Sequence, residues 1–153
     1  MTREAFNAAR GSFTNEIGHV PKATDVVWQL MNGLVRGTRD HHQLKMIYFQ
    51  MALFLKEEGK DFLATMQEAI RAELAGWQNA AETGSIDWRK TRLRVTTCGT
   101  ASCNACGKLE GATFTYSEAL NQMPIPVRDC THDISDGSHR GWCRCCYRLV
   151  FNA

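Results

Sequence analysis

The sequence predicts an α+β protein, with a helical region first and a small zinc-stabilised β domain at the C-terminus. Apolar residues recur at helical spacing between residues 24 and 81, whereas after residue 90 the pattern changes to short alternating runs, turns and prolines. All seven cysteines lie in the last third of the chain, beginning at Cys98. We therefore divide the chain into a helical region, 1–88, and a cysteine-rich zinc-binding domain, 89–153.

The composition narrows the class of protein. The chain has 153 residues, of which 44% are hydrophobic, as is normal for a globular protein, and its net charge is only +2. That charge lacks the basic footprint of a nucleic-acid enzyme. The N-terminus lacks the apolar core of a signal peptide, and no apolar stretch is long enough to span a bilayer. We expect no secretion by a signal peptide and no membrane partner. Cysteines in a chain without an export signal favour metal binding over disulfides.

The first region predicts helices because its apolar residues are spaced by three and four positions. The expected segments are 24–37, 40–55 and 61–81, and a shorter helix over 2–9 is compatible with the sequence. Thr24 or Asp25 is the expected N-cap of the segment that ends at Gly37. The helix over 40–55 is apolar on nearly every face, so it is either central in its own bundle or buried against a partner. Such a thin bundle is marginal alone, and docking onto the metal domain, or onto another protein, would stabilise it.

A basic segment, 88–95, joins the two regions. It carries four basic residues, while Leu93, Val95 and Thr97 alternate as in a strand. We interpret it as a solvated edge strand, where positive charge discourages edge-to-edge pairing. The alternative is a patch that contacts phosphate or an acidic partner, which leaves a weak nucleic-acid role open.

Short elements follow the basic segment. Residues 113–116 and 147–151 are expected as strands, and 117–121 as one capped helical turn. The segment 123–127 is expected to be extended, because Pro124 and Pro126 disfavour helix in the residue before each of them.

The cysteine spacing predicts a metal site. A C-x-x-C pair presents two thiolates to one metal across a tight turn, and a second close pair supplies the other corners of a tetrahedron. The candidate metal ligands are Cys103, Cys106, Cys130, Cys143 and Cys145. One zinc is simpler than two in so short a segment. Cys103 and Cys106 are the first ligands and Cys143 the next, whereas the fourth is open between Cys130, Cys145 and Cys146. Four thiolates make a closed, structural Zn²⁺ site.

Residues 98–151 resemble the C-terminal segment of Mu-type phage head morphogenesis proteins, the minor head proteins. The shared pattern is a C-x-x-C pair, Glu110-Gly111, an aromatic strand, two prolines, and His139 ahead of Cys143-Arg-Cys145. The chain departs from the family pattern in two ways. Three residues, not two, separate His139 from Cys143, and Cys130 and Cys146 are additional cysteines. The resemblance implies a virion-associated protein that contacts the portal or capsid, in the virion or the host cytoplasm, with no enzymatic role for this segment.

A second resemblance is to phage recombination endonucleases of the His–Me finger class. It is carried by Cys130-Thr-His132-Asp133, Gly137 and Arg140-Gly141 leading into the last cysteines. The resemblance implies that His132 activates water and that Asp133 helps to bind Mg²⁺, while Cys103, Cys106, Cys143 and Cys146 hold zinc. The spacing around His132 fits this pattern poorly.

The sequence therefore predicts a structural or interaction protein of phage or prophage origin, similar to minor head proteins, with a structural zinc. The alternative is a His–Me finger-type DNA endonuclease with structural zinc. No catalytic residue is assigned, and an enzyme is the less favoured hypothesis. The expected partner is a protein, and the apolar helix over 40–55 also makes a homo-oligomer admissible.

Overall fold

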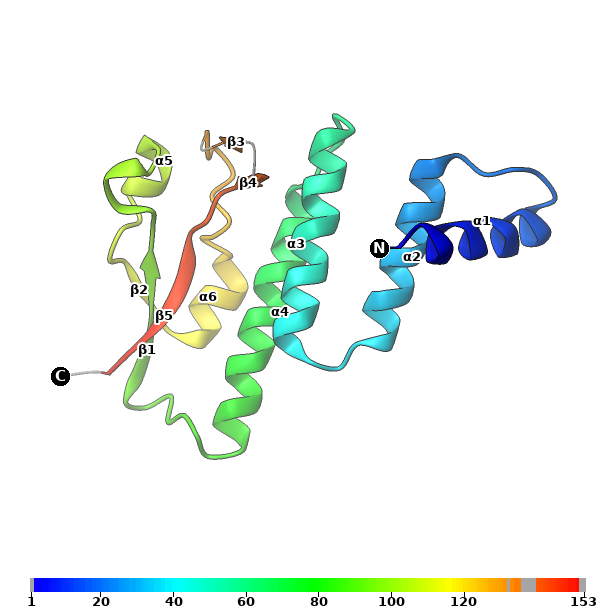
Figure 1. Cartoon of the computed structure of the whole chain (residues 1–153). Coiled ribbons are helices and arrows are strands. Elements are labelled where there is room, and N and C mark those ends of the chain that lie inside the picture. The colour runs from blue at the N-terminus through cyan, green and yellow to red at the C-terminus, as the bar shows by residue number, and fades with distance from the viewer. Residues whose placement is uncertain (1, 132, 136–139, 152–153) are drawn as a thin grey trace.

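The computed structural model describes residues 2–131, 133–135 and 140–151 (Figure 1). The first part holds four helices, α1 (Arg3–Ile17), α2 (Ala23–Gly37), α3 (His41–Glu57) and α4 (Leu63–Glu82). The second part holds the strands β1 (Thr91–Thr96), β2 (Thr113–Phe114), β3 (Asp133–Ser135), β4 (Arg140–Trp142) and β5 (Cys146–Phe151). Between the strands lie a 3₁₀ turn, η1 (Gly99–Ala101), and two short helices, α5 (Asn104–Gly107) and α6 (Tyr116–Gln122). The predicted α+β class is confirmed.

The helix α1 is longer than the sequence suggested. It begins where the N–H of Ala5 donates to Thr2 Oγ1 (3.2 Å), and it ends at Gly18, which adopts the left-handed conformation that a helix stop favours. The prediction stopped at residue 9 because α1 lacks a strong apolar stripe, and none of its residues is buried. It packs against α2, and the pair stands apart from the sheet (Figure 1).

The helices α2, α3 and α4 lie within a few residues of their predicted ranges. The expected N-cap of α2 was wrong: the helix begins at Ala23, so Thr24 and Asp25 lie inside its first turn, and Lys22 precedes it without a side-chain cap. Asp40 caps α3 by accepting from the N–H of Gln43 (2.7 Å). Among the described residues, no helix is long and apolar enough to cross a membrane.

The helices α3 and α4 form the central pair of the molecule. They pack closely, because a Cβ atom on Gly76 would lie only 3.2 Å from the Cβ of His41. Lys45 Nζ of α3 pairs with Glu73 Oε1 of α4 (2.8 Å). Since α3 also packs against α2, it is central in the helical region, which is one of the two expected alternatives for its apolar character.

The main sheet is antiparallel, with the strand order β2-β1-β5. The basic segment is therefore not an edge strand, and that interpretation was wrong. Leu93 of β1 lies between Phe114 of β2 and Leu149 of β5. Leu93 and Val95 are fully buried while Arg94 is exposed, so the alternation was right and the sheet position was not. The apolar face of β1 is buried in the core that it shares with α4, and both backbone edges of the strand are paired.

Two short segments depart from the prediction. The strand expected over 113–116 ends at Phe114, since Thr115 caps α6 and Tyr116 is its first residue. Met123 is not extended: it takes the left-handed conformation (φ 45°, ψ 57°) at the C-terminus of α6. A residue before proline prefers an extended backbone, but here the left-handed conformation that ends a helix is adopted instead.

One hydrophobic core joins the helices to the sheet. It contains Met66, Ile70 and Leu74 of α4 together with Leu93 and Val95 of β1. The buried members of the cysteine cluster described below belong to the same core. The helical region therefore takes part of its burial from the C-terminal part, which is the support that so thin a bundle needs.

Candidate metal centre

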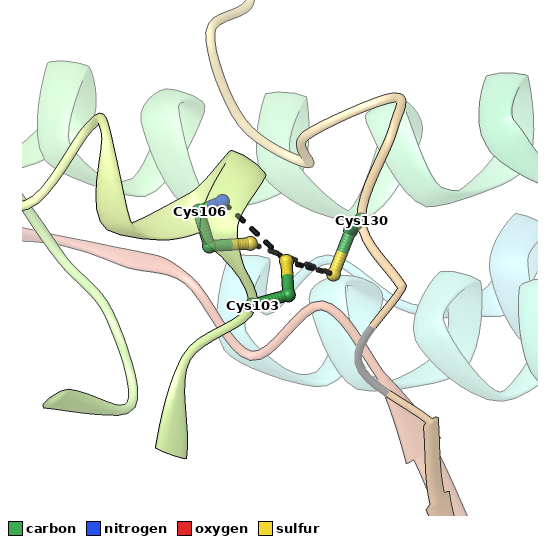
Figure 2. A group of neighbouring side chains, drawn as sticks. All are labelled: Cys103, Cys106 and Cys130. Atoms are coloured by element: carbon green, nitrogen blue, oxygen red, sulfur yellow. Dashed lines mark hydrogen bonds between the residues drawn. The ribbon is translucent and has the colours of Figure 1, made fainter. Parts of the chain in front are cut away.

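Five cysteines from three segments converge at one end of the sheet. Cys103 and Cys106 flank the start of α5, Cys130 lies in the loop after α6, and Cys143 and Cys145 lie between β4 and β5. Figure 2 shows Cys103, Cys106 and Cys130 with their sulfur atoms turned toward one another. Segments 27 residues apart in the sequence thus supply neighbouring thiols.

The C-x-x-C pair owes its geometry to a single helical turn. Cys103 is the N-cap residue of α5, and its Sγ accepts from the N–H of Cys106 (3.5 Å). The carbonyl of Cys103 accepts from the N–H of Gly107 (2.9 Å), which closes the turn. The backbone N–H groups of Cys106 and Thr131 lower the pKa of Cys103 to about 6, because they stabilise the thiolate.

The sulfur atoms lie at contact distance. Cys130 Sγ is 3.8 Å from Cys103 Sγ and 3.4 Å from Cys106 Sγ, and Cys106 Sγ is 3.9 Å from Cys143 Sγ. The five thiols form two groups of three, Cys103–Cys106–Cys130 and Cys106–Cys143–Cys145, with all sulfurs of a group within 4.8 Å. Cys106 belongs to both groups. Either group could hold a metal ion.

The electrostatics of the cluster call for a cation. Burial raises the pKa of the Cys106 thiol, and a hydrogen bond to Cys143 raises that of Cys145. The hydrogen bond from Cys145, helped by the N–H of Val127 (3.3 Å), lowers the pKa of Cys143 to about 6. Thiols so close and so buried cannot all ionise together unless a positive charge balances them. A divalent metal ion would supply that charge, and a coordinating thiol is deprotonated.

A tryptophan holds the Cys130 loop in place. Trp142, buried at the end of β4, donates from its Nε1 to the carbonyl of Cys130 (2.8 Å). Its ring meets Phe62 edge to face, with ring centroids 4.8 Å apart. The residue after it, Cys143, has a positive φ of 38°, which turns the chain back toward β5. Sequence reasoning did not single out Trp142, although a tryptophan next to a candidate ligand was a usable signal.

The structure brings together all five cysteines that the sequence singled out. Within the described residues, Cys98 and Cys146 belong to neither group, so Cys146 is not placed as the fourth ligand. His41 and His42 line a separate hollow between α3 and α4. His132 and His139 lie outside the described residues, as does Gly137. Which of the five cysteines bind a metal stays a prediction.

A carboxylate fixes the chain ahead of the C-x-x-C turn. Glu110 Oε2 accepts from the N–H of Thr97 (2.8 Å) and from the Thr97 hydroxyl, which in turn accepts from the Ser102 hydroxyl (2.7 Å). These bonds to Thr97 lower the pKa of Glu110, with a smaller contribution from Arg94. The segment that leads into Cys103 is thereby tied to the loop after α5.

This carboxylate predicts a pH dependence. Because the pKa of Glu110 is lower in the folded chain than in the unfolded one, its contribution is fully present above the unfolded value of about 4.3 and is lost as the pH falls through the folded value. Carboxyl chemical shifts in an NMR titration should place the Glu110 midpoint below that of an unstructured peptide. A midpoint at or above the peptide value would contradict the bonds to Thr97. Glu110→Gln should remove this part of the acid sensitivity.

Comparison with protein-family models, with curated proteins and with solved structures finds no match to this chain.

Proposed function

We propose that the cysteine cluster binds one structural Zn²⁺ ion and that the protein has a structural or interaction role rather than an enzymatic one. The observation that carries this proposal is the set of sulfur distances. Thiolates bound at about 2.3 Å to a tetrahedral zinc lie about 3.8 Å from one another. The consecutive distances along Cys103, Cys130, Cys106 and Cys143 are 3.8, 3.4 and 3.9 Å, close to that value. Cys143 is not within 4.8 Å of both Cys103 and Cys130, so metal binding would draw the two thiol groups together.

The kinds of donor also favour a structural zinc. Soft thiolates suit Zn²⁺ and disfavour Mg²⁺ and Ca²⁺, which prefer oxygen donors. Four thiolates fill a tetrahedron, whereas a catalytic zinc keeps one position for water. Cys106, Cys130, Cys143 and Cys145 are buried, which leaves little room for a substrate at the ion.

The helices α1 and α2 form a helical hairpin that supports the interaction role. An apolar hollow of about 540 Å³ lies between these two helices, lined in part by Ala9, Leu30 and Leu34. Leu34 is 56% exposed and Val20, in the connecting loop, is 62% exposed. A helix pair with so little burial of its own gains stability when a partner covers its apolar side chains. We propose a protein partner for this hairpin, with self-association as the alternative.

The phage setting rests on the resemblance of residues 98–151 to minor head proteins. In that setting the partner is the portal or the capsid, and the protein acts in the virion or the host cytoplasm. The zinc domain then serves as a rigid body that carries the helical hairpin. The endonuclease alternative depends on His132, which is not described, and on the side chain of Asp133, and nothing among the described residues favours it.

Metal removal tests the proposal. Because the binding free energy of a structural zinc is part of the folding free energy, a chelator should lower the unfolding temperature sharply and reduce the near-ultraviolet signal, to which Trp142 contributes. Unchanged thermal unfolding after complete metal removal would refute the structural zinc. A separate assay tests whether the protein is an endonuclease, by incubating it with Mg²⁺ and plasmid DNA. If the unaltered protein cleaves the DNA and His132→Ala does not, the interaction role is refuted in favour of an endonuclease.

A further inference from the structure

The cluster contains one thiol more than a tetrahedral zinc uses. Four sulfurs follow one another at 3.4 to 3.9 Å, from Cys103 through Cys130 and Cys106 to Cys143. The fifth, Cys145, is grouped with Cys106 and Cys143 and not with Cys103 or Cys130. An extra buried thiol beside a filled site calls for an explanation, since both of its neighbours in the cluster, Cys106 and Cys143, are already assigned to the ion.

The five thiols differ in access to solvent. Cys103 is partly exposed, whereas the other four are buried. Cys103 also lines an open hollow of about 580 Å³, with the polar side chains of Lys108 and Asp129 at its edge. A small oxidant in water therefore meets the cluster at Cys103. Two buried sulfurs lie within 4.8 Å of Cys103 Sγ, those of Cys106 and Cys130, and the Cys130 sulfur is 3.8 Å away (Figure 2).

We propose that Cys103 is the oxidation site of this metal centre. In this proposal a hydroperoxide joins Cys103 to Cys130 as a disulfide, and the zinc remains bound by Cys106, Cys143 and Cys145. The inference rests on the proposed zinc site and adds a modification to it. Cys145 is then the replacement ligand, held in contact with the two cysteines that keep the ion.

The reaction balances without any change at the metal, because Zn²⁺ has no redox chemistry. The Cys103 thiolate attacks one oxygen of hydrogen peroxide, the O–O bond breaks, and the product is a sulfenic acid with hydroxide, which takes a proton to become water. The Cys130 thiolate then attacks the sulfenic sulfur. The S–S bond forms, the S–O bond breaks, and the second hydroxide leaves and is protonated. Two thiolates are oxidised, and one peroxide is reduced to two waters.

The grouping explains why the ion stays. Oxidation removes two members of the first group, but it leaves the second group whole, because Cys106 is common to both. The ion then has three thiolates and one open position, which is the coordination of an accessible zinc rather than a closed one. Oxidation would thus convert a closed site into an open one without releasing the metal.

Mass spectrometry of the full-length zinc-loaded protein tests the proposal. After treatment with stoichiometric hydrogen peroxide, peptide mapping should find the Cys103–Cys130 disulfide first, and native mass spectrometry should find the zinc still bound. Cys145→Ser should bind one zinc when reduced, form the same disulfide, and lose its zinc on oxidation. Cys146→Ser, altered at the neighbouring residue outside both groups, should behave like the unaltered protein.

Three results would overturn the inference while leaving the zinc site intact. They are a different first disulfide, zinc loss from the oxidised unaltered protein, and failure of reduced Cys145→Ser to bind zinc, which would make Cys145 an ordinary ligand. A reduced, unaltered protein that holds no zinc would instead refute the proposed function itself.

Discussion

Cys106→Ser is expected to abolish metal binding and to unfold the C-terminal part of the protein. Cys106 is the one cysteine that belongs to both thiol groups, and it lies 3.4 Å from Cys130 Sγ and 3.9 Å from Cys143 Sγ. Structural zinc contributes about 10–16 kcal/mol in zinc-finger peptides, which matches or exceeds the roughly 5–15 kcal/mol by which whole domains are stable. Removing this ligand should therefore have a larger effect than removing any other single cysteine.

The measurement is the zinc content and the urea unfolding curve of each cysteine variant. Cys98→Ser is the matched control, because Cys98 is partly exposed and outside both groups. It should keep the zinc and the stability of the unaltered protein. If Cys106→Ser binds zinc as tightly as Cys98→Ser does, the cluster is not organised around Cys106.

Trp142→Ala is expected to cause the largest loss of stability among changes outside the cysteines. The side chain is buried, its ring packs against Phe62, and its Nε1 supplies a hydrogen bond to the carbonyl of Cys130. Replacing a buried tryptophan by alanine costs about 3–5 kcal/mol, to which the unpaired carbonyl adds about 1–3 kcal/mol if water does not reach it. The zinc affinity should fall as well, because the loop that carries Cys130 loses its anchor.

Trp142→Phe separates the two contributions. It keeps an aromatic ring against Phe62 and removes only the donor to Cys130, so its loss of unfolding free energy should be clearly smaller than that of Trp142→Ala. Urea unfolding with the metal present gives both values. A loss below about 1 kcal/mol in Trp142→Ala would mean that the contact with Phe62 does not tie the cluster to the helices.

The helices were predictable because their signal is local. The ranges expected for α2, α3 and α4 agree with the structure within a few residues, since apolar spacing directly reports which face each helix buries. The strand order was not predictable in this way. The basic residues of β1 suggested an edge, but β1 pairs with β5, whose partner residues lie 50 to 60 positions later in the chain. Such non-local pairing leaves no mark in the spacing of either strand.

The sequence indicated which cysteines lie together at the candidate site, but not how they are arranged in space. Spacing identifies Cys103 and Cys106 as a pair, because one helical turn brings them together. It does not show how the loop with Cys130 returns to that turn, since Trp142 holds this loop through a bond between distant segments. Nor does it reveal that the five thiols fall into two groups around Cys106. That grouping depends on the sheet, in which the basic segment was wrongly expected at the edge.

Native mass spectrometry of the purified protein, with elemental analysis of the same sample, is the decisive test of the proposed zinc site. We predict one zinc per chain, removable by a chelator together with loss of the folded C-terminal part. A fully reduced, folded protein that contains no metal would contradict it.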